Sequence, residues 1–276
     1  MEKSLILGFF DGVHIAHQEV ILSVAKNPTL ITFKSSPAEY FKKNTKYIYT
    51  RSDSIEKIKS LGIKDILELE FSEIANMRAE EYLGFLVKKY SPTTISTGFN
   101  HTFGLNREGN PEFLYKMQEK YNYKYICVPA LKDNNDIISS TLIRQLLERG
   151  QIERATRLLG SNFILRGKVI EGAKLGRKLG FATANLDYPK NIVKIPYGVY
   201  KAKVNDKCAV LNWGVKPTVN DTHKDGLEVH IIGFEGDIYG EEIKIELIKK
   251  IRDEKKFDCI GDLKKQIEKD VLECLK

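Results

Sequence analysis

The chain has 276 residues, 42% of them hydrophobic and 29% charged, which suits one large or two ordinary globular domains. No apolar run approaches the roughly 20 residues of a membrane-spanning helix, and Asp11 and His14 interrupt the apolar start too early for a signal peptide, so we expect a cytoplasmic protein. The net charge of +7 fits a lysine-rich solvated surface or attraction of anions such as nucleotides, and no basic block with interleaved aromatic residues supports nucleic-acid binding.

The first half of the chain alternates short apolar runs with helical patterns. We expect buried strands at residues 4–9, 29–33, 66–69, 94–97 and 125–128. Helices are expected between them, at residues 15–25, 54–61, 78–89 and 111–121. This alternation predicts an α/β Rossmann-like parallel sheet covered by helices, in which ligands bind beyond the carboxyl ends of the strands.

The pattern changes after Gly160. A helical segment at residues 139–159, broken near Gly150, is expected to be the hinge between the two halves. Further strands are expected at residues 163–169, 198–204, 209–213, 227–234 and 243–249. Because no long helix separates them, the sheet should be antiparallel and closed as a barrel. The chain ends in a predicted helix that places Leu263, Ile267, Val271 and Cys274 on one face.

The first motif, GFFDGVHIAH at residues 8–17, begins at the end of the first strand and leads directly into a helix. Its glycines at positions 8 and 12 permit a tight turn and a close approach of the backbone to a ligand. The helix N-terminus offers free N–H groups to a phosphate, and His14 and His17, on one helical face, can both donate to it. Ordinary surface or metal-binding histidines are the alternative, which the strand–turn–helix context disfavours.

This segment resembles the H-x-G-H nucleotidyltransferase superfamily, and the longer pattern G-x-F-D-G-V-H-x-G-H is specific to its FAD-synthetase branch. Two more segments carry the resemblance: GFNHTFGLNREG at residues 98–109 and SSTLIR at residues 139–144. In the family, the residue matching Asn100 contributes to the nucleotide site. Hydroxyls at a helix start, such as that of Ser139, can cap the helix and also bind phosphate.

The resemblance implies in-line attack of the FMN phosphate on the α-phosphate of ATP, with release of pyrophosphate and no covalent enzyme intermediate. Catalysis would be positioning and charge stabilisation, with His14 and His17 holding ATP phosphates and Arg144 neutralising charge. The expected nucleotide-binding residues of this half are Gly8, Phe10, Asp11, Gly12, Asn100, Ser139, Ser140 and Thr141. The sequence departs from the family pattern at four positions: Ala16, His101, Thr102 and Ile137.

The densest motif of the chain is GAKLGRKLGFATAN at residues 172–185. Its glycines, with Lys174, Arg177 and Lys178, make a flexible cationic loop suited to covering phosphates. The hydroxyl of Thr183 and the amide of Asn185 offer the hard oxygen donors that Mg²⁺ prefers. A basic β-hairpin turn is the alternative, and this segment alone leaves the two interpretations about even.

Further segments favour the phosphate-binding interpretation. The motif resembles the G-R-x-L-G-F-P-T-A-N of riboflavin kinases, with Ala182 in place of the usual proline. The segments PYGVY, NWGVKPT, EVH with YG, and IRDEKKF match, in order and spacing, other segments of these kinases. Together with the N-terminal motifs, the resemblance covers essentially the full chain. The sequence therefore resembles the prokaryotic bifunctional riboflavin kinase/FAD synthetase family.

The resemblance also implies roles in the kinase half. Glu228 would be the general base for the ribityl 5′-hydroxyl that attacks the γ-phosphate, with a surface carboxylate as the alternative. Thr183 and Asn185 would bind Mg²⁺–ATP, and Arg252 would lie on a flap that closes over the site. The expected nucleotide-binding residues of this half are Gly172, Lys174, Gly176, Arg177, Thr183 and Asn185.

We therefore expect an FMN adenylyltransferase domain over residues 1–160 and a riboflavin kinase domain over residues 161–276. The ligands of the whole protein would be riboflavin, FMN, FAD, ATP and ADP, with Mg²⁺ as cofactor. We expect neither nucleic acid nor membrane as a partner. One alternative is a monofunctional riboflavin kinase with a weakened or repurposed N-terminal domain. A class I aminoacyl-tRNA synthetase is disfavoured because the sequence has no K-M-S-K-S. A nucleic-acid or flavin-responsive binding protein, suggested by the pI of about 9.0, predicts binding without turnover.

Overall fold

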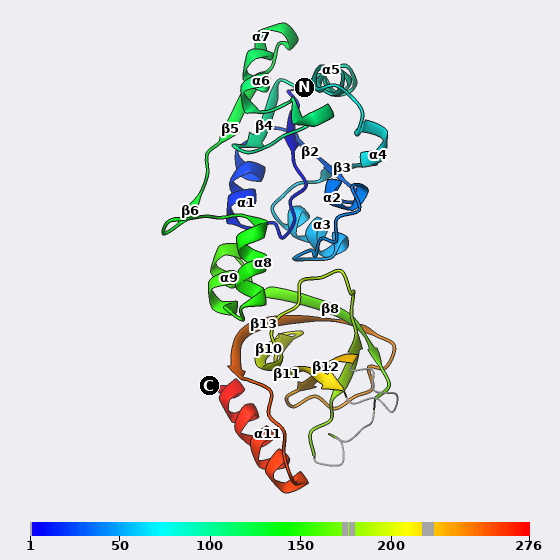
Figure 1. The fold of residues 1–276 in the computed structure, drawn as a ribbon, viewed down its shortest axis with the longest axis vertical. Helices are drawn as coiled ribbons and strands as arrows, with labels where there is room; N and C mark the ends of the chain where they lie inside the picture. The colour runs from blue at the N-terminus through cyan, green and yellow to red at the C-terminus, as the bar shows by residue number, and fades with distance from the viewer. Residues whose placement is uncertain (1, 173–175, 177–179, 217–223) are drawn as a thin grey trace. The chain divides into compact units, whose positions relative to one another are not determined.

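The computed structural model describes residues 2–172, 176, 180–216 and 224–276, which form two compact units, Met1–Leu142 and Ile143–Lys276 (Figure 1). Each unit is described by itself. The predicted boundary at residues 160 and 161 stays a prediction. Among the helices of the described residues, none is long and apolar enough to cross a membrane.

The first unit is built on a five-stranded sheet in the order β3-β2-β1-β4-β5, in which all neighbouring strands are parallel. The strands are β1 Ser4–Leu7, β2 Pro28–Phe33, β3 Asp65–Leu69, β4 Thr94–Gly98 and β5 Lys124–Val128. The five predicted strands are confirmed. Chain order reverses between β1 and β4, which is where sheets of this kind bind ligands at the carboxyl ends of their strands.

Helices separate these strands in sequence, as predicted. They are α1 Ile15–Leu22, α2 Pro37–Tyr40, α3 Arg51–Ser60, α4 Phe71–Ile74, α5 Ala79–Tyr90, α6 Pro111–Lys116 and α7 Gln118–Tyr121. The helix expected at residues 111–121 is thus two short helices. A 3₁₀ turn, η1 Leu105–Arg107, and a two-stranded hairpin, β6 Lys132–Asp133 with β7 Asp136–Ile137, complete the unit.

The side chains of β1 point alternately to the two faces of the sheet, and each face packs against a different helix. Leu5 and Leu7 pack in one cluster with Leu83 of α5, whereas Ile6 packs in a second cluster with Ile21 of α1. Successive side chains of a strand point to opposite faces, so a strand buried on both faces reads as a continuous apolar run. This accounts for the unbroken apolar sequence at the start of the chain.

The second unit is a closed barrel of six strands in the order β10-β11-β12-β9-β8-β13, with every neighbouring pair antiparallel. Its strands are β8 Phe163–Ile170, β9 Ala184–Asp187, β10 Gly198–Val204, β11 Lys207–Lys216, β12 Lys224–Ile231 and β13 Glu242–Arg252. The predicted antiparallel barrel is confirmed. Strand β9 was not predicted from the sequence.

Among the described residues, the longer helices that flank the barrel strands in sequence are α8 Ser140–Glu148, α9 Ile152–Leu159 and the C-terminal α11 Ile260–Leu275. The predicted break near Gly150 is confirmed by the gap between α8 and α9. Cys274 and Val271 of α11 pack against Val199 and Val210 of the barrel, which confirms the predicted apolar face for its last two residues.

Candidate active sites

The loop between β1 and α1 has an unusual backbone. Phe10, Gly12 and Val13 adopt φ angles of 59°, 80° and 43°. A left-handed conformation strains a branched side chain such as that of Val13, and such strain concentrates at functional loops. A Cβ on Gly8 would lie 2.6 Å from the ring of Phe10, so glycine is required there. Phe10, expected to bind nucleotide, is 3% exposed and packs against this turn.

Side chains from distant segments hold this loop. The Asp11 carboxylate accepts a hydrogen bond from the Ile48 N–H at 3.0 Å, and the Asp11 carbonyl accepts one from the Ser140 hydroxyl at 2.8 Å. The Gly12 carbonyl lies 3.5 Å from the Lys57 ammonium. Two residues of the predicted nucleotide site, Asp11 and Ser140, therefore bind one another within the protein and fix the loop.

The two histidines lie together, as their spacing predicted. His14 is the N-cap of α1 and its Nδ1 accepts a hydrogen bond from the His17 N–H at 3.3 Å, while the two rings stack with centroids 3.6 Å apart. Burial, followed by the proximity of His14 and Lys57, lowers the pKa of His17 well below its ordinary value. His17 is consequently neutral at pH 7 and can bind phosphate as a hydrogen-bond donor, without a charge.

The serine-rich segment reaches the same loop. The Ser139 hydroxyl accepts a hydrogen bond from the Leu142 N–H at 3.2 Å and so caps α8, as predicted, while Thr141 next to it is exposed. Arg144 follows Ser140 by one helical turn on α8 and is half-buried. Asn100 is exposed just after β4, at the point where the strand order reverses.

In the barrel, strand register aligns polar residues that are distant in sequence. Glu228 of β12 lies opposite Asn185 of β9 and, on its other side, opposite Asn212 of β11. Residues directly opposite in an antiparallel pair have side chains on the same face with Cβ atoms about 4.5–5.5 Å apart. Glu228 and Asn185, both predicted site residues, are therefore neighbours.

The glycine-rich motif folds back onto these residues. A Cβ on Gly172 would lie 2.5 Å from Cγ of Asn185, and one on Gly176 would lie 3.1 Å from the hydroxyl oxygen of Thr183. Each glycine thus allows the loop to approach one of the two predicted Mg²⁺ ligands. Lys174 and Arg177, predicted to bind nucleotide, lie outside the described residues.

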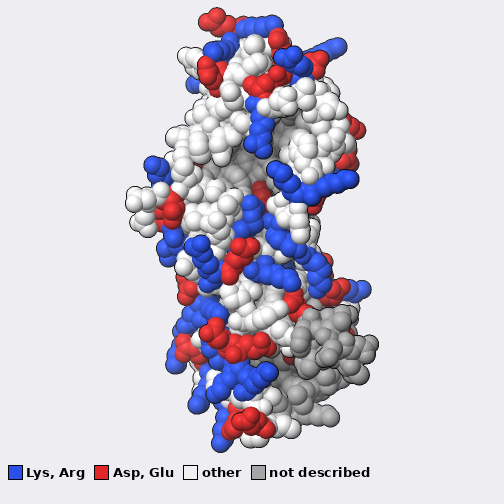
Figure 2. Space-filling view, viewed as in Figure 1, with Lys and Arg blue, Asp and Glu red and all other residues white. Residues whose placement is uncertain are grey.

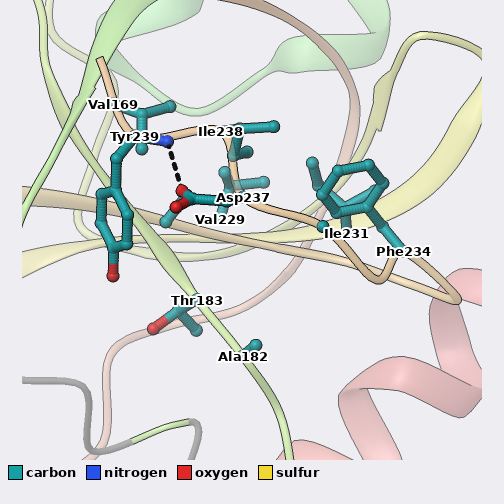
Figure 3. A pocket seen from close by; sticks show the side chains of 11 residues that line it. Val169, Ala182, Thr183, Val229, Ile231, Phe234, Asp237, Ile238 and Tyr239 are labelled. Atoms are coloured by element: carbon teal, nitrogen blue, oxygen red, sulfur yellow. Dashed lines mark hydrogen bonds between the residues drawn. The ribbon is translucent and has the colours of Figure 1, made fainter. Parts of the chain in front are cut away.

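A cavity of about 60 Å³ opens beside Thr183 (Figure 3). Apolar side chains line most of it, and Figure 3 shows Ile231 and Phe234 on one side and Tyr239 on the other. The Tyr239 N–H donates to the Asp237 carboxylate at 3.0 Å and closes a turn at the rim. The recess is thus mostly apolar, with the Thr183 hydroxyl and the Asp237 carboxylate among its lining groups, an arrangement typical of small-molecule sites.

Two further side chains of the barrel unit make well-defined polar contacts. His230 donates through Nδ1 to the carbonyl of Ala182 at 2.8 Å and so fixes the backbone next to Thr183. Arg252, at the end of β13, forms a two-pronged ion pair with Asp270 of α11, at 3.0 and 2.8 Å. Its predicted place on a closing flap stays a prediction.

Two family models match the chain: FAD synthetase over residues 1–142 and riboflavin kinase over residues 159–276. A protein from Buchnera aphidicola subsp. Schizaphis graminum, named bifunctional riboflavin kinase/FMN adenylyltransferase, is 38% identical over 98% of this chain and 92% of its own length. This chain belongs to the bifunctional riboflavin kinase/FMN adenylyltransferase family. Its relative from Bacillus subtilis is 34% identical over 99% of this chain and 91% of its own.

A relative in Escherichia coli with the same name is 30% identical over 97% of this chain and 90% of its own length. A solved structure described as a macrolide-efflux protein from Streptococcus pneumoniae matches with a TM-score of 0.87 at 30% identity, covering 98% of this chain and 93% of that one. The prediction of a two-activity flavin enzyme that uses ATP is confirmed by the two matched domains and the named relatives.

Three polar residues that were not predicted from the sequence as site residues lie beside the predicted ones: Lys57, Asn212 and His230. Asn212 and His230 stand inside segments that were matched to the kinases, so those segments carried a signal for them. Lys57 stands in an ordinary lysine-rich helical pattern and had no such signal. Figure 2 shows why charge alone does not reveal such a residue, since basic and acidic side chains are interspersed over the visible face.

Proposed function

We propose that the residues gathered in each unit perform the two reactions of the family: phosphorylation of riboflavin to FMN in the barrel, and adenylylation of FMN to FAD in the α/β unit. The observation that carries this proposal is the register of β9 and β12. This register sets the Glu228 carboxylate beside Asn185. Thr183, two residues before Asn185, lines the apolar recess.

In the kinase site Glu228 accepts the proton of the ribityl 5′-hydroxyl as that oxygen attacks the γ-phosphate of ATP. Thr183 and Asn185 would hold Mg²⁺, which would neutralise charge on the ATP phosphates. They fit this ion, because a hydroxyl and an amide oxygen are the hard donors it prefers. The ring bound in the recess is adenine, since Thr183 both lines the recess and holds the phosphates.

The α/β unit places FMN and ATP for in-line transfer. His14 and His17 donate to ATP phosphates, together with the N-terminus of α1. The predicted role of Arg144 in neutralising charge stays a prediction, because Arg144 falls in the second unit. Asn100 contacts the nucleotide at the point where strand order reverses. We place these reactions in the cytoplasm, a proposal supported by the four free cysteines and by the need for ATP.

The substitution Glu228→Gln tests the kinase proposal. It keeps the size of the side chain but removes the base, so FMN formation from riboflavin should fall by a factor of about 10²–10⁴. FAD formation from supplied FMN should be unchanged. The matched control is Glu242→Gln, which removes an exposed carboxylate from strand β13 and should leave both rates unchanged.

The measurement is chromatographic separation of FMN and FAD after incubation with ATP and Mg²⁺. Normal FMN formation by Glu228→Gln would remove Glu228 from the role of base. Loss of FAD formation as well would show that the two sites are not separate.

A further inference from the structure

The ammonium group of Lys57 lies beneath the nucleotide loop. Lys57 belongs to α3, and its Nζ is 3.5 Å from the carbonyl of Gly12 and 5.3 Å from the centroid of the Tyr49 ring. Gly12 separates Asp11 from Val13 and His14, so this contact falls in the middle of the loop whose backbone is left-handed. A lysine 45 residues away in sequence thus supports the turn that leads into α1.

The charge of Lys57 matters because His17 beside it supplies none. His17 is neutral at pH 7, and burial together with the charge of Lys57 contributes to that state. The triphosphate of ATP and the phosphate of FMN bring several negative charges into this site. In a partly buried site, charge of that kind needs fixed positive groups and oriented donors.

We propose that Lys57 is a positioning residue for adenylyl transfer: its ammonium fixes the carbonyl of Gly12 and supplies a positive charge under the ATP phosphates. This inference rests on the proposed function of the α/β unit. Lys57 acts through the loop, because its hydrogen bond is to Gly12 and the loop presents His14 and the α1 N–H groups to the phosphates.

Ionisable groups from several elements surround Lys57. Tyr49, from the segment before α3, lies under its ammonium, and His17 of α1 feels its charge. The loop that Lys57 contacts at Gly12 also carries His14 and Asp11, whose carboxylate accepts from Ile48. Asp53 lies one turn earlier on α3 and accepts from the Thr50 hydroxyl at 2.5 Å. Burial is the cause that lowers the pKa of Lys57, to about 8.

This pKa gives the inference a signature that a structural role lacks. Below pH 8 the free protein carries the charge of Lys57, and above it the charge is lost. The pH dependence of kcat/KM reports the free enzyme. The kcat/KM for ATP in FAD formation should therefore fall as pH rises through about 8, while FMN formation by the other unit should show no fall linked to this lysine.

Three variants test the inference, with FMN and ATP as substrates and FAD and pyrophosphate as products. In Lys57→Met, kcat/KM for ATP at pH 7 should fall about 10- to 100-fold, less than the 10²–10³ lost with a donor that touches the reacting oxygen. In Lys57→Arg most of this loss should be restored, and the fall near pH 8 should disappear because a guanidinium keeps its charge. Lys59→Met, at an exposed lysine of the same helix, is the control and should match the unaltered protein.

Either of two results would overturn the inference: Lys57→Met within twofold of the unaltered protein, or Lys57→Arg with the same alkaline fall. If Lys57→Met does not fold, the pH profiles of the unaltered protein and of Lys57→Arg still decide. A chain that makes no FAD from FMN at any pH would refute the proposed adenylylation itself. FAD formation that is insensitive to Lys57 would refute this inference alone.

Discussion

Gly172→Ala adds a single methyl group at the kinase site, where the glycine-rich loop touches Asn185. The φ of Gly172 lies outside the left-handed region, so the added Cβ introduces no backbone strain of its own. Its effect comes from the Asn185 side chain, whose Cγ would be 2.5 Å away. Asn185 is 5% exposed, and its strand pairs with β8 on one side and β12 on the other, so the backbone cannot retreat.

The size of the effect follows from these distances. The nearest Asn185 atom, the amide nitrogen, would lie 1.9 Å from the new Cβ, whereas heavy atoms in ordinary contact are about 3.5–4.0 Å apart, so the amide must move by more than about 1 Å. A displacement of about 1 Å at a reacting centre can lower a rate by about 10²-fold. Overpacking of this kind also lowers the free energy of unfolding by about 1–3 kcal/mol. We expect kcat/KM for ATP in FMN formation to fall about 100-fold, with FAD formation from FMN unchanged.

The assay is a double-mutant cycle with Asn185→Ala, measured by FMN formation at saturating riboflavin. If the methyl acts through the amide, removing the amide makes room for it, and the double variant should be no slower than Asn185→Ala alone. Gly261→Ala is the control in the same unit, because a Cβ there meets only Cys259 Sγ at an ordinary 3.8 Å. Normal kinase activity in Gly172→Ala, or losses that multiply in the double variant, would refute the placement of the loop against Asn185.

Two other predictions concern the stability of the barrel unit. Asp270→Asn removes a carboxylate that is 4% exposed and pairs with Arg252, so it should lower the free energy of unfolding in urea denaturation by about 3 kcal/mol. Asp262→Asn, on the exposed side of α11, is the control. Equal stability of the two variants would contradict the prediction. A chain that begins at residue 151 retains α9, whose Ile152, Ala155, Leu158 and Leu159 are buried, whereas one that begins at residue 161 loses them. The shorter chain should still form FMN, but its free energy of unfolding in urea denaturation should be lower by at least about 3 kcal/mol. Equal stability of the two chains would favour the predicted boundary at residue 160.

Local sequence determined the elements and much of the chemistry. The apolar run of β1, buried on both faces, and the helical spacing of His14 and His17 are features of a few consecutive residues, so periodicity and turn chemistry predicted them. The serine cap at Ser139 and the break near Gly150 were predictable for the same reason. The change from alternating strands and helices to strands alone was enough to predict a parallel sheet in one half and an antiparallel barrel in the other.

Tertiary structure decided which distant residues meet. β9 is only four residues long, and two of them are Asn185 and Asp187, residue types that are depleted in strands. Its pairing with β8 and β12 makes it a strand. The approach of Glu228 to Asn185 depends on that register, because a shift by one residue turns every side chain to the other face. The contact of Lys57 with Gly12 and the pair of Arg252 with Asp270 likewise join separate segments. No local pattern records them, because long-range contacts arise only when the strands and helices pack together.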